Sequence, residues 1–358
     1  MSLPAAKRNE IVHKIIESIG EIKESGTLDV VTIARKYNVT TQTIYRYLKK
    51  LEKEGRIVRT PKGRENIYEL TEIVKVFSLS VEEGAEDVAW NSHVEKFVKG
   101  TPECAYHVLY YIFTEMINNA IDHSEGTEIK VRISKNELQT EFSILDNGVG
   151  IFNKIASAMN LAEKRFAILE LSKGKFTTNP ESHTGEGIFF SSKAADLFVI
   201  SSDGLTFSSN VKYEKAPEIS SEYMIWDSPL LHIGTGVFFV VHHSHSKPLK
   251  ALFDEFADPS DDYRFEKTAV PVKLVEFGNE TPLFISRSQA KRLLVRFEEF
   301  KKIIIDFSDI DSIGQGFADE VFRVFPNNHP ETQLIPTNCS ESVKQMIARV
   351  SGKRDVVS

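Results

Sequence analysis

The sequence predicts a multidomain α+β protein with two or three domains. Its 358 residues exceed the roughly 100–200 residues of one typical domain. Helical periodicity prevails in the first part of the chain, and strand and helix patterns alternate in the last part. The hydrophobic fraction of 41% and the charged fraction of 27% exclude wholesale disorder and fibrous classes. We expect a first domain at residues 1–72, a second at 73–245, a linker at 246–270 and a third domain at 271–358.

The charge of the chain is distributed unevenly. The net charge is −7, which by itself argues against a nucleic-acid partner. Residues 1–70, however, hold 14 Lys and Arg against 9 Asp and Glu, whereas the remaining residues hold 30 against 42. A basic segment attached to an acidic body is typical of contact with nucleic acid.

The basic segment has the element order of a winged helix-turn-helix. Apolar residues at helical spacing predict a first helix in residues 7–24, and Asp29 precedes a short second helix, Val30–Lys36. Thr40 can cap a third helix that ends at Gly55. Residues 56–60 and 66–70 predict two short strands around a turn-rich hairpin tip.

Residues 28–59 closely resemble bacterial winged-helix regulators, which implies that the third helix enters the major groove of DNA. Residues 40–64 carry eight Lys and Arg and two Glu, a local charge suited to phosphates. The resemblance implies that bases and phosphates are contacted by Thr41, Gln42, Thr43, Tyr45 and Arg46, and the backbone by Lys49, Lys50, Arg59, Lys62 and Arg64. The alternative is a winged helix used for protein contacts.

A polar pattern interrupts the predicted apolar helix at residues 106–123. Glu115 and Asn119 lie four residues apart and therefore share one face of the helix. Acid and amide groups inside an apolar helix are costly unless they are satisfied. A divalent metal with a nucleotide would satisfy them, because an amide oxygen is a hard ligand suited to Mg²⁺. A nearby carboxylate could orient or deprotonate a water molecule.

Two glycine motifs follow this helix. Strand patterns at residues 128–134 and 137–145 end in Asp146 and the sequence NGVGI, where glycines let the backbone approach a ligand. Gly185 and Gly187 precede a helical pattern that runs to Leu197, and a glycine turn at a helix N-terminus can bind phosphate. The segment between the motifs carries hydroxyl and basic residues that suggest a lid over phosphates, namely Lys164, Arg165, Lys173, Lys175, Thr177 and Thr178.

The ordered set of motifs (ExxxNAxxH, DNGVGI, GEGI and then GTGV) resembles the GHKL ATPase superfamily over about residues 75–243. This resemblance implies a Bergerat-type α/β sandwich that binds ATP and Mg²⁺. It implies that Asn119 coordinates the metal, that Glu115 activates the attacking water or hydroxyl, and that Asp146 accepts the adenine amino hydrogen. The remaining cofactor contacts that it implies are Gly148 and Gly150 at adenine, Gly185 and Gly187 at the phosphates, and Thr235 near adenine; Asn118, Asp122 and His123 lie beside the site.

Two features depart from the sensor kinases of this superfamily. The second glycine motif is the short form GEGIFF, and a winged helix takes the place of a phosphoacceptor-histidine hairpin. His13 on the first helix is expected to be a surface or packing residue. The alternatives to an active ATPase are a domain that binds ATP without turnover and an unrelated α/β domain.

The last part of the chain predicts a small α/β domain. Strands are expected at residues 272–277, 282–285, 302–307 and 333–336, and helices at 286–300, from Gln315 to about Phe325, and at 340–350. This layout resembles STAS domains, the fold of anti-anti-sigma factors. The resemblance makes Ser312 a candidate phosphosite; the alternative is that Ser312 caps the helix that follows.

Composition restricts the location of the protein. The longest apolar runs, such as Val237–Val241, fall short of the ~18 residues that span a membrane. A polar N-terminus predicts no secretory signal, and two cysteines predict a reducing, cytoplasmic environment. His242, His243 and His245 cluster, but strand alternation separates the first two, so we expect no metal site there.

Together these patterns predict a cytoplasmic, ATP-binding signalling or transcription regulator. Its ATPase domain would bind Mg-ATP and either hydrolyse it or transfer its phosphoryl group to serine, coupled to a DNA-binding winged helix. One alternative is a DNA-binding transcription factor with ATP as a ligand. Another is an anti-sigma-like partner-switching protein with a sigma-factor-like or STAS partner. A homodimer is a further expectation.

Overall fold

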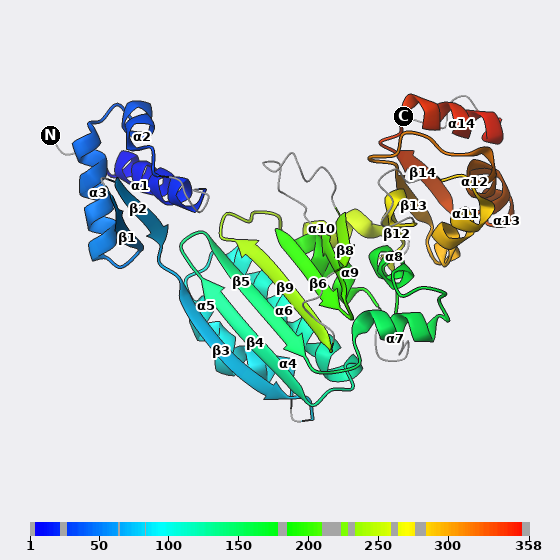
Figure 1. The fold of residues 1–358 in the computed structure, drawn as a ribbon, viewed down its shortest axis with the longest axis horizontal. Helices are drawn as coiled ribbons and strands as arrows, with labels where there is room; N and C mark the ends of the chain where they lie inside the picture. The colour runs from blue at the N-terminus through cyan, green and yellow to red at the C-terminus, as the bar shows by residue number, and fades with distance from the viewer. Residues whose placement is uncertain are drawn as a thin grey trace.

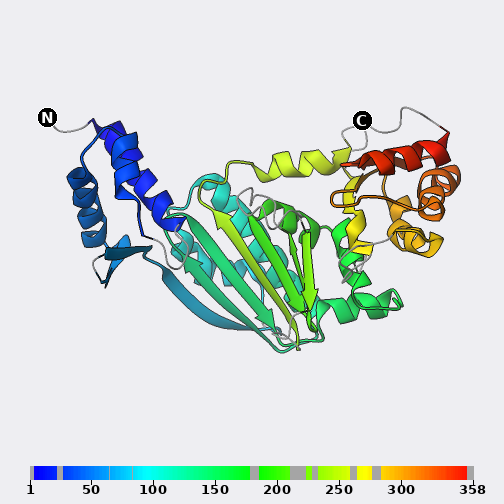
Figure 2. The same ribbon diagram turned by 45° about the horizontal axis from the view of Figure 1, so that its top comes forward.

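The computed structural model describes residues 4–21, 27–63, 65–82, 84–177, 185–209, 223–227, 233–258, 264–275 and 284–352. In this part of the chain, three bodies lie in a row along the longest axis (Figure 1). The N-terminal helices and hairpin form one end, a large sheet with helices on one face forms the centre, and a small α/β unit forms the other end. The same order is visible after a 45° turn (Figure 2).

The N-terminal body has the predicted winged-helix order. Its elements are α1 (Ala5–Gly20), α2 (Val30–Lys36), α3 (Thr41–Lys53), β1 (Ile57–Lys62) and β2 (Glu65–Leu70). The side chain of Thr40 caps α3, as expected, and that of Asp29, which was expected only to precede α2, caps that helix. Each cap satisfies a backbone N–H of the first helical turn. The apolar sides of the three helices close a separate core that includes Ile11, Ile44 and Leu48.

The central body is built on a seven-stranded sheet. Its strands are β3 (Ile73–Ser80), β4 (Glu128–Lys135), β5 (Gln139–Asp146), β6 (Leu197–Ser202), β7 (Leu205–Ser209), β8 (Tyr223–Asp227) and β9 (Thr235–His242). They lie in the order β3-β4-β5-β9-β6-β7-β8, and every pair is antiparallel. The ends of β5 and β9 therefore place Asp146 beside Thr235.

Helices cover one face of this sheet (Figure 1). They are α4 (Glu86–Ala89), a π-helical turn (Trp90–Val94), α5 (Glu95–Val98), α6 (Glu103–His123), α7 (Ile151–Ala158), α8 (Phe166–Lys173) and α9 (Gly187–Ala194). Helix α6 packs on β5, β9 and α9, and its buried side includes Leu109, Ile112 and Met116. The predicted helix at Gly187 ends at Ala194 rather than Leu197, because Leu197 starts β6 and pairs with Val240.

The turn between β4 and β5 contacts the winged helix. Arg56 makes a two-point ion pair with Glu137, with Nε–Oε1 at 2.8 Å and Nη2–Oε2 at 3.0 Å. Leu138 packs against the core of the winged helix. Strand β5 thus runs from this contact at one end to Asp146 at the other.

The C-terminal body contains the predicted small α/β unit. Strands β12 (Lys267–Pro271), β13 (Lys302–Asp306) and β14 (Gln333–Thr337) form a parallel sheet. Its helical segments are a 3-10 helix (Val272–Val275), α11 (Arg287–Leu294), a second 3-10 helix (Phe297–Glu299), α12 (Gln315–Asp319), a π-helical turn (Glu320–Val324), α13 (Phe325–Asn328) and α14 (Glu341–Ser351).

Several predicted bounds in this region are wrong. The strand expected at 272–277 instead occupies 267–271, and Val272–Val275 is a 3-10 helix. The strand expected at 282–285 is a single bridge from Phe284 to Ile313 within the described residues. Helix α11 stops at Leu294, before Arg296 adopts a left-handed backbone with φ of 60°. Sequence periodicity does not show such breaks, because all of these segments are apolar on one side.

The range expected to be a linker contains regular structure. Helix α10 (Leu249–Phe256) packs on α6 and α9, and β10 (Ala257–Asp258) pairs with β11 (Arg264–Phe265). Aromatic residues of this range join those of neighbouring elements: Phe265 lies 4.8 Å from Phe189 and 5.6 Å from Phe300, ring centre to ring centre. The central and C-terminal bodies consequently share one continuous hydrophobic core.

Candidate nucleotide site

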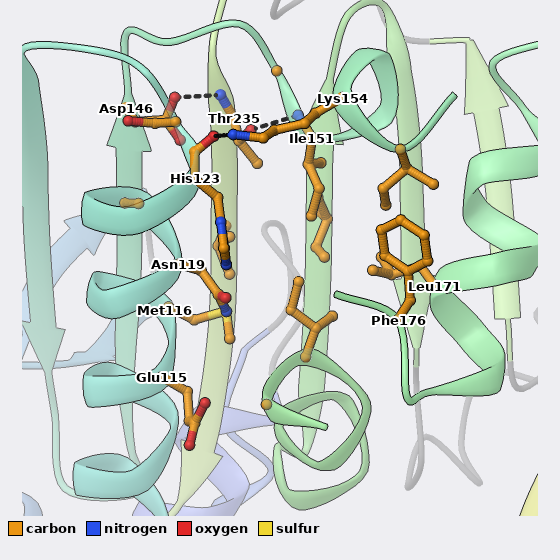
Figure 3. A pocket seen from close by; sticks show the side chains of 18 of the residues that line it. Glu115, Met116, Asn119, His123, Asp146, Ile151, Lys154, Leu171, Phe176 and Thr235 are labelled. Atoms are coloured by element: carbon orange, nitrogen blue, oxygen red, sulfur yellow. Dashed lines mark hydrogen bonds between the residues drawn. The ribbon is translucent and has the colours of Figure 1, made fainter. Parts of the chain in front are cut away.

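A pocket opens beside α6 at the ends of β5 and β9 (Figure 3). It holds about 1080 Å³ of empty space, a figure that includes open solvent, and its lining combines apolar side chains with a few polar groups, as is usual for small-molecule sites. Seven of the predicted nucleotide residues line it: Glu115, Asn119, Asp146, Gly150, Gly185, Gly187 and Thr235. The structure therefore brings together residues that are up to 120 positions apart in the sequence.

Asp146 is the buried acid at one end of this pocket. Its Oδ1 accepts hydrogen bonds from the backbone N–H of Gly148 at 2.9 Å and of Thr235 at 3.1 Å. Burial raises the pKa of the Asp146 carboxyl above its ordinary value, and these hydrogen bonds oppose the rise. The arrangement holds the carboxylate in one orientation while burying it with only 5% of its surface exposed.

The β9 end of the pocket depends on Gly234. Its φ is 77°, and a Cβ there would overlap the carbonyl oxygen of Asp146. Only glycine fits such a close backbone approach without strain. The next residue, Thr235, accepts a hydrogen bond on Oγ1 from the N–H of Ile151 at 3.0 Å. These contacts join β5, β9 and the start of α7 around the acid.

Gly148 has a different role from the predicted one. It does not line the pocket; a Cβ at this position would overlap the carbonyl of Ser124. The neighbouring Val149 N–H donates to the same carbonyl at 2.8 Å. Gly148 therefore lets the strand end pack against the end of α6, and Gly150, with φ of 85°, is the glycine that faces the cavity.

Glu115 and Asn119 project from α6 into the pocket (Figure 3). A Cβ at Gly187 would overlap Glu115 Oε2, so the carboxylate lies against the first turn of α9. Burial raises the pKa of the nearby Tyr111 strongly, and the charges of Glu115 and Glu186 raise it further. The carboxylates of Glu115 and Glu186 thus belong to the end of the pocket near the glycine turn.

Asn119 suits a site that a nucleotide phosphate and a magnesium ion share, because its amide N–H group can donate to a phosphate oxygen and its amide oxygen can bind the metal. The amide nitrogen of Asn119 is buried and has no hydrogen-bond partner within the described chain, an unusual state for a buried polar atom. Among the described residues, no group of three or more His, Cys, Asp or Glu could hold a metal. A metal at Asn119 would therefore need oxygen ligands from outside the protein, which phosphates and water provide.

The pocket also includes His123, which the sequence placed beside the site, and residues that the sequence did not single out, such as Lys154. His123 lines it, while its carbonyl accepts from Lys154 Nζ at 2.8 Å; the Lys154 ammonium also contacts Glu125 at 2.9 Å. The apolar lining residues are Met116, Ile144, Ile151, Ile155, Leu171, Phe176, Ile188, Ile200 and Val237. They are ordinary core types in the sequence, and only the fold shows that they face a cavity.

Lys173 and Lys175, which were predicted to contact phosphates, do not line the pocket. Lys173 is fully buried, and its Nζ contacts Glu170 at 2.6 Å and the carbonyl of Val295 at 2.8 Å. Lys175 Nζ donates to the carbonyl of Glu299 at 2.7 Å. Both ammonium groups thus serve the contact with the C-terminal body. Thr177 lines the pocket, whereas Thr178 lies outside the described residues.

The predicted DNA-contacting residues lie on an exposed side of the winged helix. Eight of them are exposed: Thr41, Gln42, Tyr45, Arg46, Lys49, Lys50, Arg59 and Lys62. Thr43 is half-buried and its Oγ1 lies 3.0 Å from that of the capping Thr40, so it helps to start α3. Arg59 pairs with Glu52 at 3.3 Å. Arg64 lies outside the described residues.

Ser312 is exposed but does not cap a helix. The N-cap of α12 is Gly314, so the alternative role for Ser312 is wrong. Its neighbour Asp311 accepts from Ser340 Oγ at 2.7 Å, and Ser340 caps the helix after β14. Ser312 therefore belongs to the carboxyl edge of the parallel sheet. The pocket-lining end of α8 contacts the amino edge instead, where Thr268 Oγ1 donates to the carbonyl of Lys173 at 2.7 Å.

Three families match successive parts of the chain. Residues 21–64 match the HTH domain, residues 106–212 match the histidine kinase-, DNA gyrase B-, and HSP90-like ATPase, and residues 289–344 match a STAS-like domain of unknown function. A search of curated proteins found no match. No helix in the described ranges is long and apolar enough to cross a membrane.

Two solved structures show a remote likeness. The IcIR transcriptional regulator from Alicyclobacillus acidocaldarius is 11% identical, covers 70% of this chain and 93% of its own, and has a TM-score of 0.19. The possible transcriptional regulator YydK from Bacillus subtilis subsp. subtilis str. 168 is 12% identical, with coverages of 66% and 94% and a TM-score of 0.15. Scores this low carry no conclusion about fold or function.

The three family matches fall on the three bodies of the structure in the predicted order. The ATPase match covers most of α6, β5 and the glycine turn, which line the pocket, whereas the β9 residues that line it lie beyond the match. The chain is therefore a three-domain protein that joins a helix-turn-helix domain, a GHKL-type ATPase domain and a STAS-like domain.

Proposed function

We propose that the protein is a cytoplasmic, ATP-dependent transcription regulator. Residues 1–72 would bind DNA, residues 73–245 would bind and turn over Mg-ATP, and residues 271–358 would form the STAS-like domain. The observation that carries the proposal is the convergence of Glu115, Asn119, Asp146 and the two glycine motifs on one pocket.

Each pocket residue has a chemical part in this proposal. The fixed, buried carboxylate of Asp146 accepts the adenine amino hydrogen, and the apolar lining residues pack on the base. Gly185, Gly187 and the N-terminal end of α9 face the phosphates, where backbone N–H groups and the helix dipole favour negative charge. Asn119 holds Mg²⁺, which supplies positive charge at the phosphates. Glu115, on the same face of α6, orients and deprotonates the attacking water.

The winged helix supports a DNA partner. Its exposed basic residues lie on α3 and the hairpin, and the local charge of residues 40–64 is positive although that of the chain is negative. Such a surface supplies the phosphate attraction on which DNA affinity depends. The alternative, a winged helix that binds protein, needs no such concentration of charge.

Hydrolysis is favoured over transfer to Ser312 of the same chain. Ser312 lies at the carboxyl edge of the parallel sheet, whereas the pocket-lining end of α8 contacts the amino edge. Strands rise about 3.3 Å per residue, so the five residues of β13 separate the two edges by more than about 10 Å. Ser312 remains a candidate to accept a phosphoryl group from the ATPase domain of another chain.

Incubation of the purified protein with γ-labelled ATP and Mg²⁺ tests the proposal. We expect free labelled phosphate from the wild type, and at least about a hundredfold less from Glu115→Ala, since a positioned general base contributes at this scale. The variant should still bind ATP, because Glu115 is not at the adenine end.

Each other outcome identifies a different function. Label on Ser312 would indicate a kinase, and its loss in Ser312→Ala would verify the acceptor. ATP binding without release or transfer would indicate a ligand sensor. Equal turnover by the wild type and Glu115→Ala would contradict the assigned role of Glu115.

A further inference from the structure

One short segment faces the nucleotide pocket and the C-terminal domain at the same time. Leu171, Phe176 and Thr177 line the pocket. Between them, Lys173 and Lys175 contact the C-terminal domain through the carbonyls of Val295 and Glu299. A movement of residues 170–177 at the pocket is therefore expected to change their contact with the C-terminal domain, and the reverse.

Arg296 of the C-terminal domain makes the most direct contact with this segment. Its Nη2 donates to the carbonyl of Gly174 at 2.9 Å, and its guanidinium carbon lies 5.4 Å from the centre of the Phe176 ring. Glu299 holds the guanidinium at 2.9 and 3.0 Å from the other side. The side chain of Phe176 is thus in contact with both the pocket and Arg296.

Phe176 is also packed against the glycine turn that faces the predicted phosphates. A Cβ at Gly185 would lie 2.5 Å from the backbone carbon and oxygen of Phe176. Gly185 itself lines the pocket. The position of Phe176 therefore sets the space available at this turn, and Arg296 restrains Phe176.

Buried charge makes this contact specific. Lys173 and Glu170 form a buried ion pair at 2.6 Å, and Arg296 Nη1 lies 3.6 Å from the second oxygen of Glu170. Burial lowers the pKa of Lys173 to about 8, against the opposing effect of Glu170. Removing one member of a buried charge network leaves the others uncompensated, so the two domains fit together in one arrangement.

The backbone of Arg296 supports a constrained role. Its φ of 60° is left-handed, a region that non-glycine residues keep only where the surroundings fix them. The side chain is only 12% exposed. Both observations fit a residue held in place by contacts on several sides.

We propose that Arg296 is a positioning residue for the nucleotide pocket: it holds residues 174–176 so that Phe176 and Thr177 form one wall of the site. The proposal rests on ATP binding by this pocket, as argued above. Linkage makes the effect reciprocal, so a bound nucleotide strengthens the contact between the ATPase and STAS-like domains. The strength of the contact between the STAS-like and ATPase domains thereby depends on whether nucleotide is bound.

Two measurements on Arg296→Ala test this proposal in the full chain. Hydrogen exchange should become faster in residues 170–177, because their contact with the C-terminal domain is weakened. The dissociation constant for Mg-ATP should rise about tenfold, within the usual range of coupling between sites. Arg296→Lys keeps the positive charge but lacks the planar guanidinium group, so its exchange rate and dissociation constant should lie between those of the wild type and Arg296→Ala. This conservative variant also controls for misfolding.

The matched control is Arg287→Ala. Arg287 lies on the neighbouring helix α11 and pairs with Asp319 inside the same domain at 3.0 Å, so ATP affinity should not change. In the wild type, added ATP should slow exchange in residues 170–177 and 287–300.

The outcomes separate this inference from the proposed function. If the wild type fails to bind ATP, the proposed function is wrong and the inference fails with it. If the wild type binds ATP and Arg296→Ala binds it equally well, only the positioning role is contradicted, whatever the change in exchange.

Discussion

At the scale of residues, Asp146 shows how the fold prepares an acid for recognition. Two backbone N–H groups fix its Oδ1, and the residue is buried with 5% of its surface exposed. Such an acceptor can distinguish an adenine amino group from the carbonyl oxygen that guanine has at the same place. The sequence predicted this residue from its motif alone, but its hydrogen-bond partner Thr235 comes from a strand 89 residues later.

Replacement of Asp146 by Asn should reduce the preference of the pocket for ATP over GTP. Asp146→Asn keeps the size of the side chain and removes an ionised acceptor, so ATP affinity should fall at least about tenfold while any GTP affinity changes less. Competition of both nucleotides with a fluorescent ATP analogue measures this preference. An unchanged ratio would show that Asp146 does not contact the base.

The affinity for ATP should also fall on acidification. Burial raises the pKa of Asp146 in the folded protein, so the carboxyl takes up a proton at a higher pH than an exposed carboxyl does. The protonated form is the weaker acceptor, and affinity is therefore lost as the pH falls through the raised pKa. The Asp146→Asn variant is the control, because its affinity should lack this pH dependence.

The lysines illustrate where prediction from the sequence fails at this scale. Lys173 and Lys175 occur between two nucleotide motifs, which made phosphate a reasonable partner. The sequence does not reveal that Glu170 and two carbonyls of the C-terminal domain compete for these ammonium groups. Long flexible side chains take the partner that tertiary packing brings closest.

At the scale of elements, the sequence predicted the helices and strands that have strong local signals. Thr40 caps α3 as expected, and strand β5, which ends at the pocket, has nearly the predicted bounds. Prediction failed where tertiary contacts end or start an element. Strand β3 and helix α10 were not predicted, because β3 is defined by pairing with β4 and α10 by packing on α6 and α9.

Helix α3 should carry the DNA affinity of the protein. Arg46 is exposed on α3, and Arg46→Ala should weaken DNA binding and reduce the slope of log affinity against log salt by about 0.9 if one phosphate contact is lost. Fluorescence anisotropy over a salt series measures both. Lys250→Ala on α10, far along the chain from the winged helix, is the control. No effect of salt on the wild type would exclude DNA as the partner.

At the scale of the whole molecule, contacts on both sides of the pocket connect the three domains. Arg56 and Leu138 join the winged helix to the β4–β5 turn, and strand β5 continues from there to Asp146. Arg296 and residues 170–177 join the other side of the same pocket to the STAS-like domain. The candidate nucleotide site lies between these contacts. The winged helix and the STAS-like domain on either side of it match separate families, and the sequence does not show that both contact the ATPase domain near the site.

The Arg56–Glu137 pair should couple the nucleotide to DNA. Arg56→Ala removes both hydrogen bonds to Glu137, so the winged helix should retain its fold while the effect of ATP on DNA affinity shrinks. The pair is about two-thirds buried, and its loss should cost no more than ~1 kcal/mol of stability. DNA titrations with and without ATP measure the coupling, and Lys250→Ala, which removes an exposed pair with Asp254 outside the winged helix, is the control. An unchanged ATP effect in Arg56→Ala would exclude this route.

The measurement that tests the central claim most directly is a calorimetric titration of the full chain with ATP, with and without Mg²⁺. We expect the wild type to bind one ATP per chain more tightly with Mg²⁺. Asn119→Ala should lose most of this Mg²⁺ dependence, because the metal-binding amide is absent. Absence of ATP binding by a folded wild type, or equal Mg²⁺ dependence in the wild type and Asn119→Ala, would contradict the account.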